Sequence, residues 1–275
     1  MKFQSIIYTS VTLAASLIFS ACGSGDEPAV ENRQEVAFEI SDCGFGSDSR
    51  TYEDGYTTKF NPGDACGLYI VRDGKPVAEN VKLTVTSYTE GKPNWLPAEN
   101  IYGGLPGESY FLYSPYQENI TGKVNLNADT DEDFFAPLIS GWEVKIDQSG
   151  NANYTASDLM TAKGTSNSVS GTLRLSFALT HRMALAVIEM PKIRYGNGGS
   201  SDTGVMTVST DFIPGSAIPS WDIKGFRYIV NPDKPAVTIQ GVYEDNNFFS
   251  ITPTGLKRGQ YKIYLVDGGN ENIIN

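Results

Sequence analysis

Apolar and polar residues alternate with a period of two in segments spread along the whole chain. The clearest segments are 36–40, 81–86, 172–179 and 261–265. Successive side chains of a β-strand point to opposite faces, so this period predicts strands with one buried face. Helical spacing is limited to residues 156–162, where one or two turns are predicted. The predicted fold class is therefore all-β.

Denser apolar runs at 67–71, 110–113 and 184–188 are typical of central strands. Turn signals separate the strands at Asp73-Gly74, Pro106-Gly107, Gly198-Gly199, Asn231-Pro232-Asp233 and Asp267-Gly268. Short strands with frequent turns predict antiparallel β-sandwiches. The small, polar segment 163–171 indicates a boundary, which predicts an N-terminal domain at 35–165 and a C-terminal domain at 166–275.

The first residues predict export. Lys2 precedes a mostly apolar run at 6–19, and small residues stand directly before Cys22. This order is typical of a signal peptide, predicted at 1–21, and the following residues 22–34 are predicted to form a tether. The site resembles the lipobox of bacterial lipoproteins, in which the cysteine thiol is acylated, although Phe19 stands where leucine is usual. The alternative is an ordinary secretory signal with an incidental cysteine.

The charge balance argues against one class of partner. The chain has 21 basic and 32 acidic residues, a formal net charge of −11. Such a surface repels a phosphate backbone, so no nucleic-acid partner is predicted.

Cysteine use leaves two alternatives open. If Cys22 is lipidated, Cys43 and Cys66 remain as a pair in an oxidising compartment, where disulfides persist. The pair forms either a disulfide or two free buried thiols, because sequence does not place the two Cα atoms within reach.

Residues suited to catalysis are scarce. His181 is the only histidine and follows an alternating strand, so a packed or hydrogen-bonded role is predicted for it. The acidic cluster 129–133 lacks the glycine and the ligand spacing of a calcium loop and is predicted to be solvated. No catalytic residue, metal or cofactor is predicted. Trp95, Trp142 and Trp221 could stack on sugar rings, but at least two of them are predicted to lie in the core.

Several segments, taken in order, resemble the fimbrillin family, the subunits of type V pili. The first is Phe60-Asn61-Pro62-Gly63-Asp64 followed by an apolar strand. The others are Asn94-Trp95 in an expected polar loop, Tyr113-Ser114-Pro115-Tyr116 at a strand end, Asp158-Leu159-Met160, Leu175-Ser176-Phe177 leading into residues 181–185, and the turn Leu256-Lys257-Arg258-Gly259-Gln260-Tyr261. Each motif is weak alone, and their order behind a lipoprotein signal carries the resemblance.

The resemblance implies two transthyretin-like sandwich domains in tandem and a structural role without catalysis. It implies a lipid-anchored protein exposed on the outer membrane or incorporated in fimbriae, whose partners are other fimbrial subunits and a host or bacterial surface ligand. In the family a protease removes the first strand, and a strand of another subunit fills the groove. Here that strand would contain Val36, Phe38 and Ile40, and Arg50 stands at a matching cleavage position. Arg33 is a second candidate, but cleavage there would leave the strand attached.

Two points remain open at this stage. A disulfide between Cys43 and Cys66 would tether a strand cut at Arg50, so the bridge and strand exchange are predicted to exclude each other. The alternative function is a glycan-binding surface lipoprotein of a polysaccharide-uptake system, which would expose coplanar aromatic residues.

Overall fold

The computed structural model describes residues 34–47, 56–189, 192–196, 203–207, 213–214, 218–220, 225–243, 247–266 and 273–274. All of these belong to one compact unit by their contacts, Asn32–Asn275. Several sequence predictions lie outside the described residues: the signal peptide, Cys22, Arg33, Arg50, Trp221 and the turns at 198–199 and 267–268. The described part is built mainly of strands, and the all-β prediction is confirmed.

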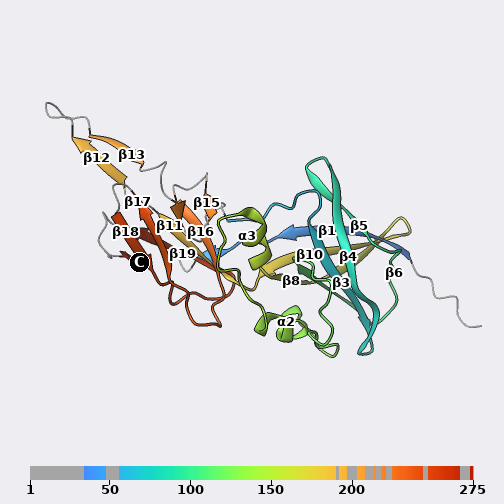
Figure 1. The fold of residues 1–275 in the computed structure, drawn as a ribbon. Helices are drawn as coiled ribbons and strands as arrows, with labels where there is room; N and C mark the ends of the chain where they lie inside the picture. Colours follow the sequence, from blue (N-terminus) through green and yellow to red (C-terminus); the bar gives the residue numbers. More distant parts are fainter. Residues whose placement is uncertain are drawn as a thin grey trace, which may run out of the picture. The chain divides into compact units, whose positions relative to one another are not determined.

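The largest sheet has nine strands, in the order β5-β4-β3-β7-β8-β10-β1-β6, with β9 paired to β10 (Figure 1). Its strands are β1 (Gln34–Asp42), β3 (Ala65–Arg72), β4 (Lys75–Thr89), β5 (Lys92–Pro97), β6 (Tyr102–Gly103), β7 (Glu108–Ser114), β8 (Met160–Lys163), β9 (Thr165–Val169) and β10 (Thr172–His181). The alternating segments 36–40, 81–86 and 172–179 lie in β1, β4 and β10 as predicted.

A second sheet has the order β15-β16-β11-β19-β2, with β20 paired to β19. Its strands are β2 (Gly46–Ser47), β11 (Ala184–Glu189), β15 (Ile218–Ser220), β16 (Gly225–Val230), β19 (Gln260–Val266) and β20 (Ile273–Ile274). Two small sheets complete the described strands: β12 (Lys192–Gly196) with β13 (Thr203–Thr207), and β14 (Ile213–Pro214) with β17 (Ile239–Tyr243) and β18 (Asn247–Ile251).

The predicted strand directions need a correction, because the sheets are mixed and not purely antiparallel. β1 runs parallel to β10, and β19 runs parallel to both β11 and β2. Period-two alternation tells which face of a strand is buried, but it does not tell which strand pairs with it or in which direction. Parallel partners need a long connection, and here Ser41 and Phe177 come together from 136 positions apart.

The prediction of a helix at 156–162 was wrong in its placement. The helices are α1 (Asp131–Phe134), α2 (Ala136–Ser140) and α3 (Asn151–Ser157), and β8 begins at Met160. The acidic cluster, expected as a solvated loop, begins α1 because the Thr130 side chain accepts from the amide of Asp133 at 3.1 Å and caps the helix. Among the described residues, no helix has the length and apolarity to cross a bilayer.

Of two motif positions from the sequence analysis, one differs from the expectation and the other is confirmed. Asn94-Trp95, expected in a polar loop, lies in the edge strand β5, where Trp95 alternates inward and is buried. The Tyr113-Ser114-Pro115 strand end is confirmed, and its Ser114–Pro115 bond is cis.

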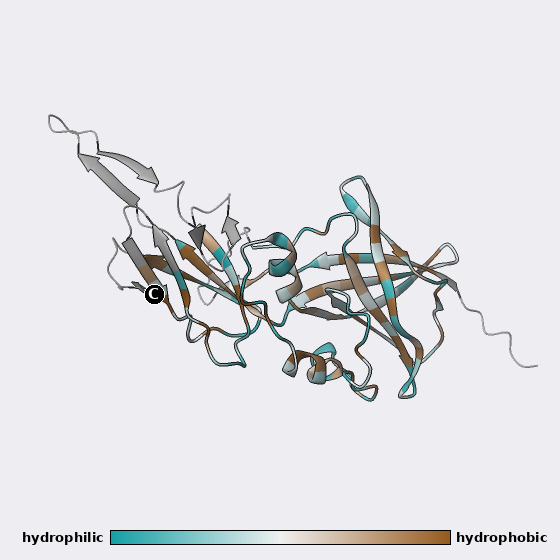
Figure 2. Cartoon of the chain, viewed as in Figure 1, coloured by the Kyte–Doolittle hydropathy of each residue, from teal (hydrophilic) through white to brown (hydrophobic). Residues whose placement is uncertain are grey.

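The buried apolar residues that the structure describes form three clusters, and Figure 2 shows apolar colours along the strands with hydrophilic colours at the hairpin tips. The first cluster is lined by the nine-stranded sheet and includes Leu68, Leu83, Leu112, Leu175 and Phe177. The second draws on both halves of the chain and includes Tyr69, Phe111, Phe134, Leu185 and Ile229. The third belongs to the C-terminal strands and includes Ile188, Tyr228, Phe249 and Tyr264. The expected boundary between 165 and 166 falls inside β9, and the division into two domains stays a prediction.

The centre of β3 has no room for a side chain at Gly67. A Cβ there would lie 2.1 Å from Cε1 of Tyr113, whose hydroxyl donates to Asn80 at 2.7 Å. We expect Gly67→Ala to lower the free energy of unfolding by about 1–3 kcal/mol, because the buried ring must move. Gly150→Ala is the control, since a Cβ at Gly150 meets nothing within 4 Å. Urea unfolding of both variants measures the difference, and equal midpoints would contradict the packing described.

Candidate functional site

The first described strand, β1, lies in a groove and is paired mainly along one of its two edges. β1 pairs with β10 in register from Val36 opposite Leu173 to Asp42 opposite Leu179. On its other edge the recorded strand partner is β6, which reaches only Gln34 and Glu35. The rest of that edge faces β5 without ladder pairing in the described residues, and Lys92 contacts Glu39 there at 3.2 Å. β1 is therefore held mainly by one neighbouring strand and by its side chains.

Those side chains complete the first apolar cluster. Ile40 is buried, while Val36 and Phe38 are partly buried and pack against the same cluster. They lie on the same face as Leu173, Leu175 and Phe177 of β10. The strand predicted at 36–40 is thus confirmed, and its apolar residues fill positions that the sheet would otherwise expose.

The segment continues from β1 into the second sheet. The amide of Cys43 donates to Leu179 at 2.9 Å, and the amide of Gly46 donates to Gly259 at 2.8 Å. β2 then pairs in parallel with the start of β19. Residues 34–47 therefore form one ribbon that is paired to both large sheets.

His181 lies where this ribbon leaves the first sheet. Its Nδ1 is 2.9 Å from Oδ2 of Asp158, and its Nε2 is 3.0 Å from Oδ1 of Asp42. The Nε2 contact has the distance of an ion pair, but its direction is not that of a hydrogen bond. The three side chains are 0%, 6% and 2% exposed for His181, Asp158 and Asp42. The ring of Phe45 stacks on the imidazole with centroids 3.6 Å apart.

The contacts within this buried triad shift the pKa values of His181 and Asp42. Burial alone would lower the pKa of His181, but the charges of Asp158 and Asp42 outweigh it and raise the pKa to about 9. Burial would likewise raise the pKa of Asp42, yet His181 and the amides of Thr58 and Gly44 lower it below its usual value. Those amides donate to Asp42 at 2.5 Å and 2.9 Å. At neutral pH the triad is an imidazolium between two carboxylates.

The triad predicts a loss of stability at alkaline pH. The pKa of His181 is about 9 in the fold against 6.5 for the free side chain, so folding favours its charged form. Its contribution is complete below pH 6.5 and disappears as the pH rises through 9, about 3 kcal/mol in all. The lowered pKa of Asp42 affects stability at acidic pH, where its contribution is lost as the pH falls below about 3.8. Urea unfolding between pH 6 and pH 10 measures the slope, and a His181→Gln variant with the same slope would contradict the assignment.

The two cysteines of the proposed disulfide are free thiols in this structure. Cys66 lies fully buried in the first cluster, where burial raises the pKa of its thiol to about 12, while Cys43 is exposed. The two side chains thus lie in different environments. Both thiols are free in the structure, but the expectation of buried thiols holds for Cys66 and not for Cys43. The free thiols leave β1 without a covalent tether to β3.

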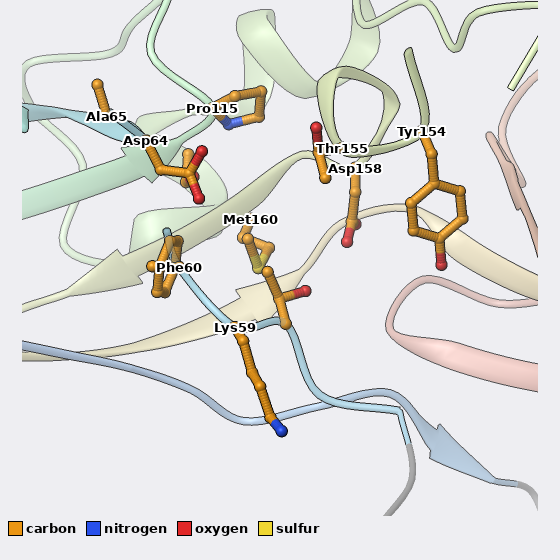
Figure 3. Close-up of a pocket in the computed structure, with 11 residues that line it drawn as sticks. Lys59, Phe60, Asp64, Ala65, Pro115, Tyr154, Thr155, Asp158 and Met160 are labelled. Atoms are coloured by element: carbon orange, nitrogen blue, oxygen red, sulfur yellow. The ribbon is translucent and has the colours of Figure 1, made fainter. Parts of the chain in front are cut away.

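The position of His181 agrees with the packed role predicted for it and gives no support to a role in catalysis. Both of its ring nitrogens face carboxylates, so neither is directed at a hydroxyl or thiol. A pocket of about 80 Å³ lies beside the triad, with Tyr154, Thr155 and Asp158 to one side and Phe60 and Pro115 to the other (Figure 3). It is well below the volume of a typical small-molecule site, and His181 does not line it.

The other predicted sites are also accounted for within the described residues. No group of three or more His, Cys, Asp or Glu residues there could hold a metal ion. Asp131 of the acidic cluster instead forms an ion pair with Arg182, and Thr161 donates to the same carboxylate at 2.5 Å. Trp95 and Trp142 are 8% and 7% exposed, so neither offers a platform for sugar stacking.

Sequence reasoning found His181 but missed its partners. Asp42 follows Val36, Phe38 and Ile40 at the next alternate position, so its side chain continues the inward-facing series of β1. His181 likewise continues the inward series of β10. The signal available in the sequence was an ionisable residue at an inward-facing position. Predicting that Asp42 contacts His181 also required knowing that β1 and β10 are parallel.

Comparison with known proteins agrees with this architecture. The model of the family described as fimbrillin-like matches residues 49–273. A protein of Bacteroides ovatus, whose name proposes it as the fimbrium tip subunit Fim1C, is 32% identical over 96% of this chain and 52% of its own length. The crystal structure of a fimbrial protein from Bacteroides ovatus superposes with a TM-score of 0.69 at 30% identity, over 86% of this chain and 49% of that one.

The chain spans about half the length of these relatives. The match nevertheless covers most of the chain: it includes the strands from β3 to β19 and begins after β1 and β2. The chain belongs to the fimbrillin-like family.

Proposed function

We propose that this chain is a structural subunit of a type V fimbria or a fimbria-associated adhesin, assembled at the cell surface by β-strand addition. The observation that carries the proposal is the placement of β1, which pairs with β10 from Val36 to Asp42 and with β6 only at Gln34 and Glu35, and whose alternate side chains pack on the first cluster. Removing such a strand opens a slot with unpaired backbone groups and apolar pockets, which another extended segment can fill. The fimbrial names of the relatives support the same role.

Export and processing complete the proposal. The protein would reach the surface as a lipoprotein acylated at Cys22, and cleavage at Arg50 would release β1 and β2 together. Free thiols at Cys43 and Cys66 would permit that release, because no disulfide would then join the ribbon to β3. The partners would be other fimbrial subunits, and the fibre would present a ligand-binding surface.

The proposal is tested by blocking the cleavage. The full chain and its Arg50→Gln variant are expressed on a bacterial surface, and fibres are counted by negative-stain electron microscopy. Mass spectrometry of the surface protein identifies its first residue. We expect wild-type fibres whose subunits begin after Arg50, and no fibres from the variant. Arg33→Gln is the matched control, since cleavage there leaves β1 attached. Fibres built equally well by Arg50→Gln would overturn processing at this position, and the absence of the chain from fibres of every variant would overturn the fimbrial role.

The glycan-binding alternative is not favoured. It would need exposed coplanar aromatic side chains. Both described tryptophans are buried, and the exposed tyrosines among the described residues, Tyr88 and Tyr102, lie on different strands, β4 and β6.

A further inference from the structure

The groove of β1 ends in a charged position, although the rest of its inward side is apolar. Val36, Phe38 and Ile40 pack on the first cluster, and the next inward residue is the carboxylate of Asp42. A carboxylate at the end of an apolar strand costs desolvation unless a partner compensates. His181 supplies that partner from β10.

The groups around His181 divide into those that leave with β1 and those that stay. Asp42 and the Phe45 ring belong to the ribbon 34–47, so both depart if the ribbon is replaced. Asp158, which precedes β8, stays on the body of the protein. The adjacent Arg182 points elsewhere, toward Asp131 and Thr161.

Two further titratable groups lie near the Asp158 side of the triad. Tyr154 of α3 is partly buried, desolvation raises its pKa, and its hydroxyl interacts with Arg227. Arg227 in turn lies over the ring of Tyr56, 4.9 Å from its centroid. The charge facing the vacated Asp42 position is therefore that of the His181 ring.

An empty groove would consequently present a half-paired imidazole at the end of three apolar pockets. A strand that brings an apolar residue to that position would leave the ring without its second carboxylate. A strand that brings a carboxylate would restore the ion pair, and the amide of Thr58, which stays on the body of the protein, is placed to hold it. Breaking a buried pair is far more costly than losing an exposed one.

We propose that His181 is the specificity-determining residue of the β1 groove, and that it selects an inserted strand whose three alternating apolar residues are followed, two residues later, by an aspartate. The inference rests on the proposed strand addition and names the chemistry of the strand that is accepted. In the intact chain Asp42 itself occupies this position and retains β1 in its groove.

The test uses the full chain with a recognition sequence for a specific protease placed between Ser47 and Tyr56. After cleavage, the ribbon remains bound without a covalent link and competes with a labelled synthetic peptide of residues 34–47. Binding of the peptide is followed by fluorescence anisotropy at pH 7. The peptides are the native sequence, Asp42→Asn, Asp42→Leu and Glu39→Gln, so the protein itself is never altered in its folded core.

We expect the native peptide to bind and both Asp42 variants to bind about 100-fold more weakly, since a buried ion pair is lost. Glu39→Gln removes the same charge from an exposed pair with Lys92 and is expected to change the affinity by less than about fivefold. Raising the pH through 9 should weaken the native peptide and leave Asp42→Asn nearly unchanged, because only the native peptide depends on the imidazolium.

The outcomes separate the two proposals. Equal binding of the native and Asp42→Asn peptides would overturn selection by His181 and leave strand addition standing. Equal losses for Asp42→Asn and Glu39→Gln would reduce the effect to net charge and would also overturn it. If the cleaved chain loses its own ribbon and still binds none of the peptides, strand addition itself is overturned.

Discussion

Replacing His181 with glutamine is expected to lower the free energy of unfolding at pH 7 by about 3–5 kcal/mol, because two buried carboxylates would remain without their cation. Asp42 and Asp158 are 2% and 6% exposed, so water does not take the place of the imidazolium. Urea unfolding followed by circular dichroism measures the loss. Lys92→Gln is the matched control: it also removes a cation from a carboxylate of β1, but its pair is exposed and is expected to contribute less than about 1 kcal/mol.

A second substitution identifies the cause of that loss. If repulsion and desolvation of the carboxylates destabilise His181→Gln, adding Asp42→Asn should recover part of the stability, because one of the two charges is removed. Additive losses in the double variant would instead mean that the imidazole ring contributes mainly by its packing on Phe45.

Truncating Phe134 to alanine is expected to cost about 3–5 kcal/mol, since the side chain is fully buried in the second cluster. Its ring stacks on Phe111 with centroids 4.0 Å apart and meets Tyr69 edge-on at 5.4 Å. Leu96→Ala is the control, because Leu96 is 60% exposed and should shift stability by less than about 0.5 kcal/mol. Thermal unfolding by calorimetry measures both variants.

The same experiment tests the division into two domains. The second cluster contains Phe111 and Tyr69 from the first half and Leu185 and Ile229 from the second. We expect Phe134→Ala to move a single transition that fluorescence and circular dichroism report together. Two transitions, of which only one moves, would mean that each half has an independent core.

The sequence was a reliable guide where one strand face is buried and the other exposed. Apolar residues alternate with polar ones without a break at Leu173, Leu175, Phe177 and Leu179, and all four lie in β10. The alternation in β1 was equally clear, so the strand and its inward residues were predictable. The direction of β1 was not, because alternation is the same for a parallel and an antiparallel neighbour.

The short helices were harder to predict because their turns depend on tertiary contacts. α1 has only four residues and is fixed by its Thr130 cap and by the burial of Phe134. The triad was missed for a related reason. Asp42 and His181 are both visible in the sequence, but each gains its partner only after strands far apart in the chain have paired.

The parallel register of β1 also decides how the protein would respond to tension. A pull on the chain before Gln34, directed along the strand, loads the paired positions from Val36 to Asp42 at the same time. Such shearing requires many hydrogen bonds to break together, whereas peeling an end breaks them one after another. His181 stands at the far end of that ladder, so the ion pair would act as a stop against sliding. A strand held in this way would resist a pull along its own length and would yield more readily to a sideways pull.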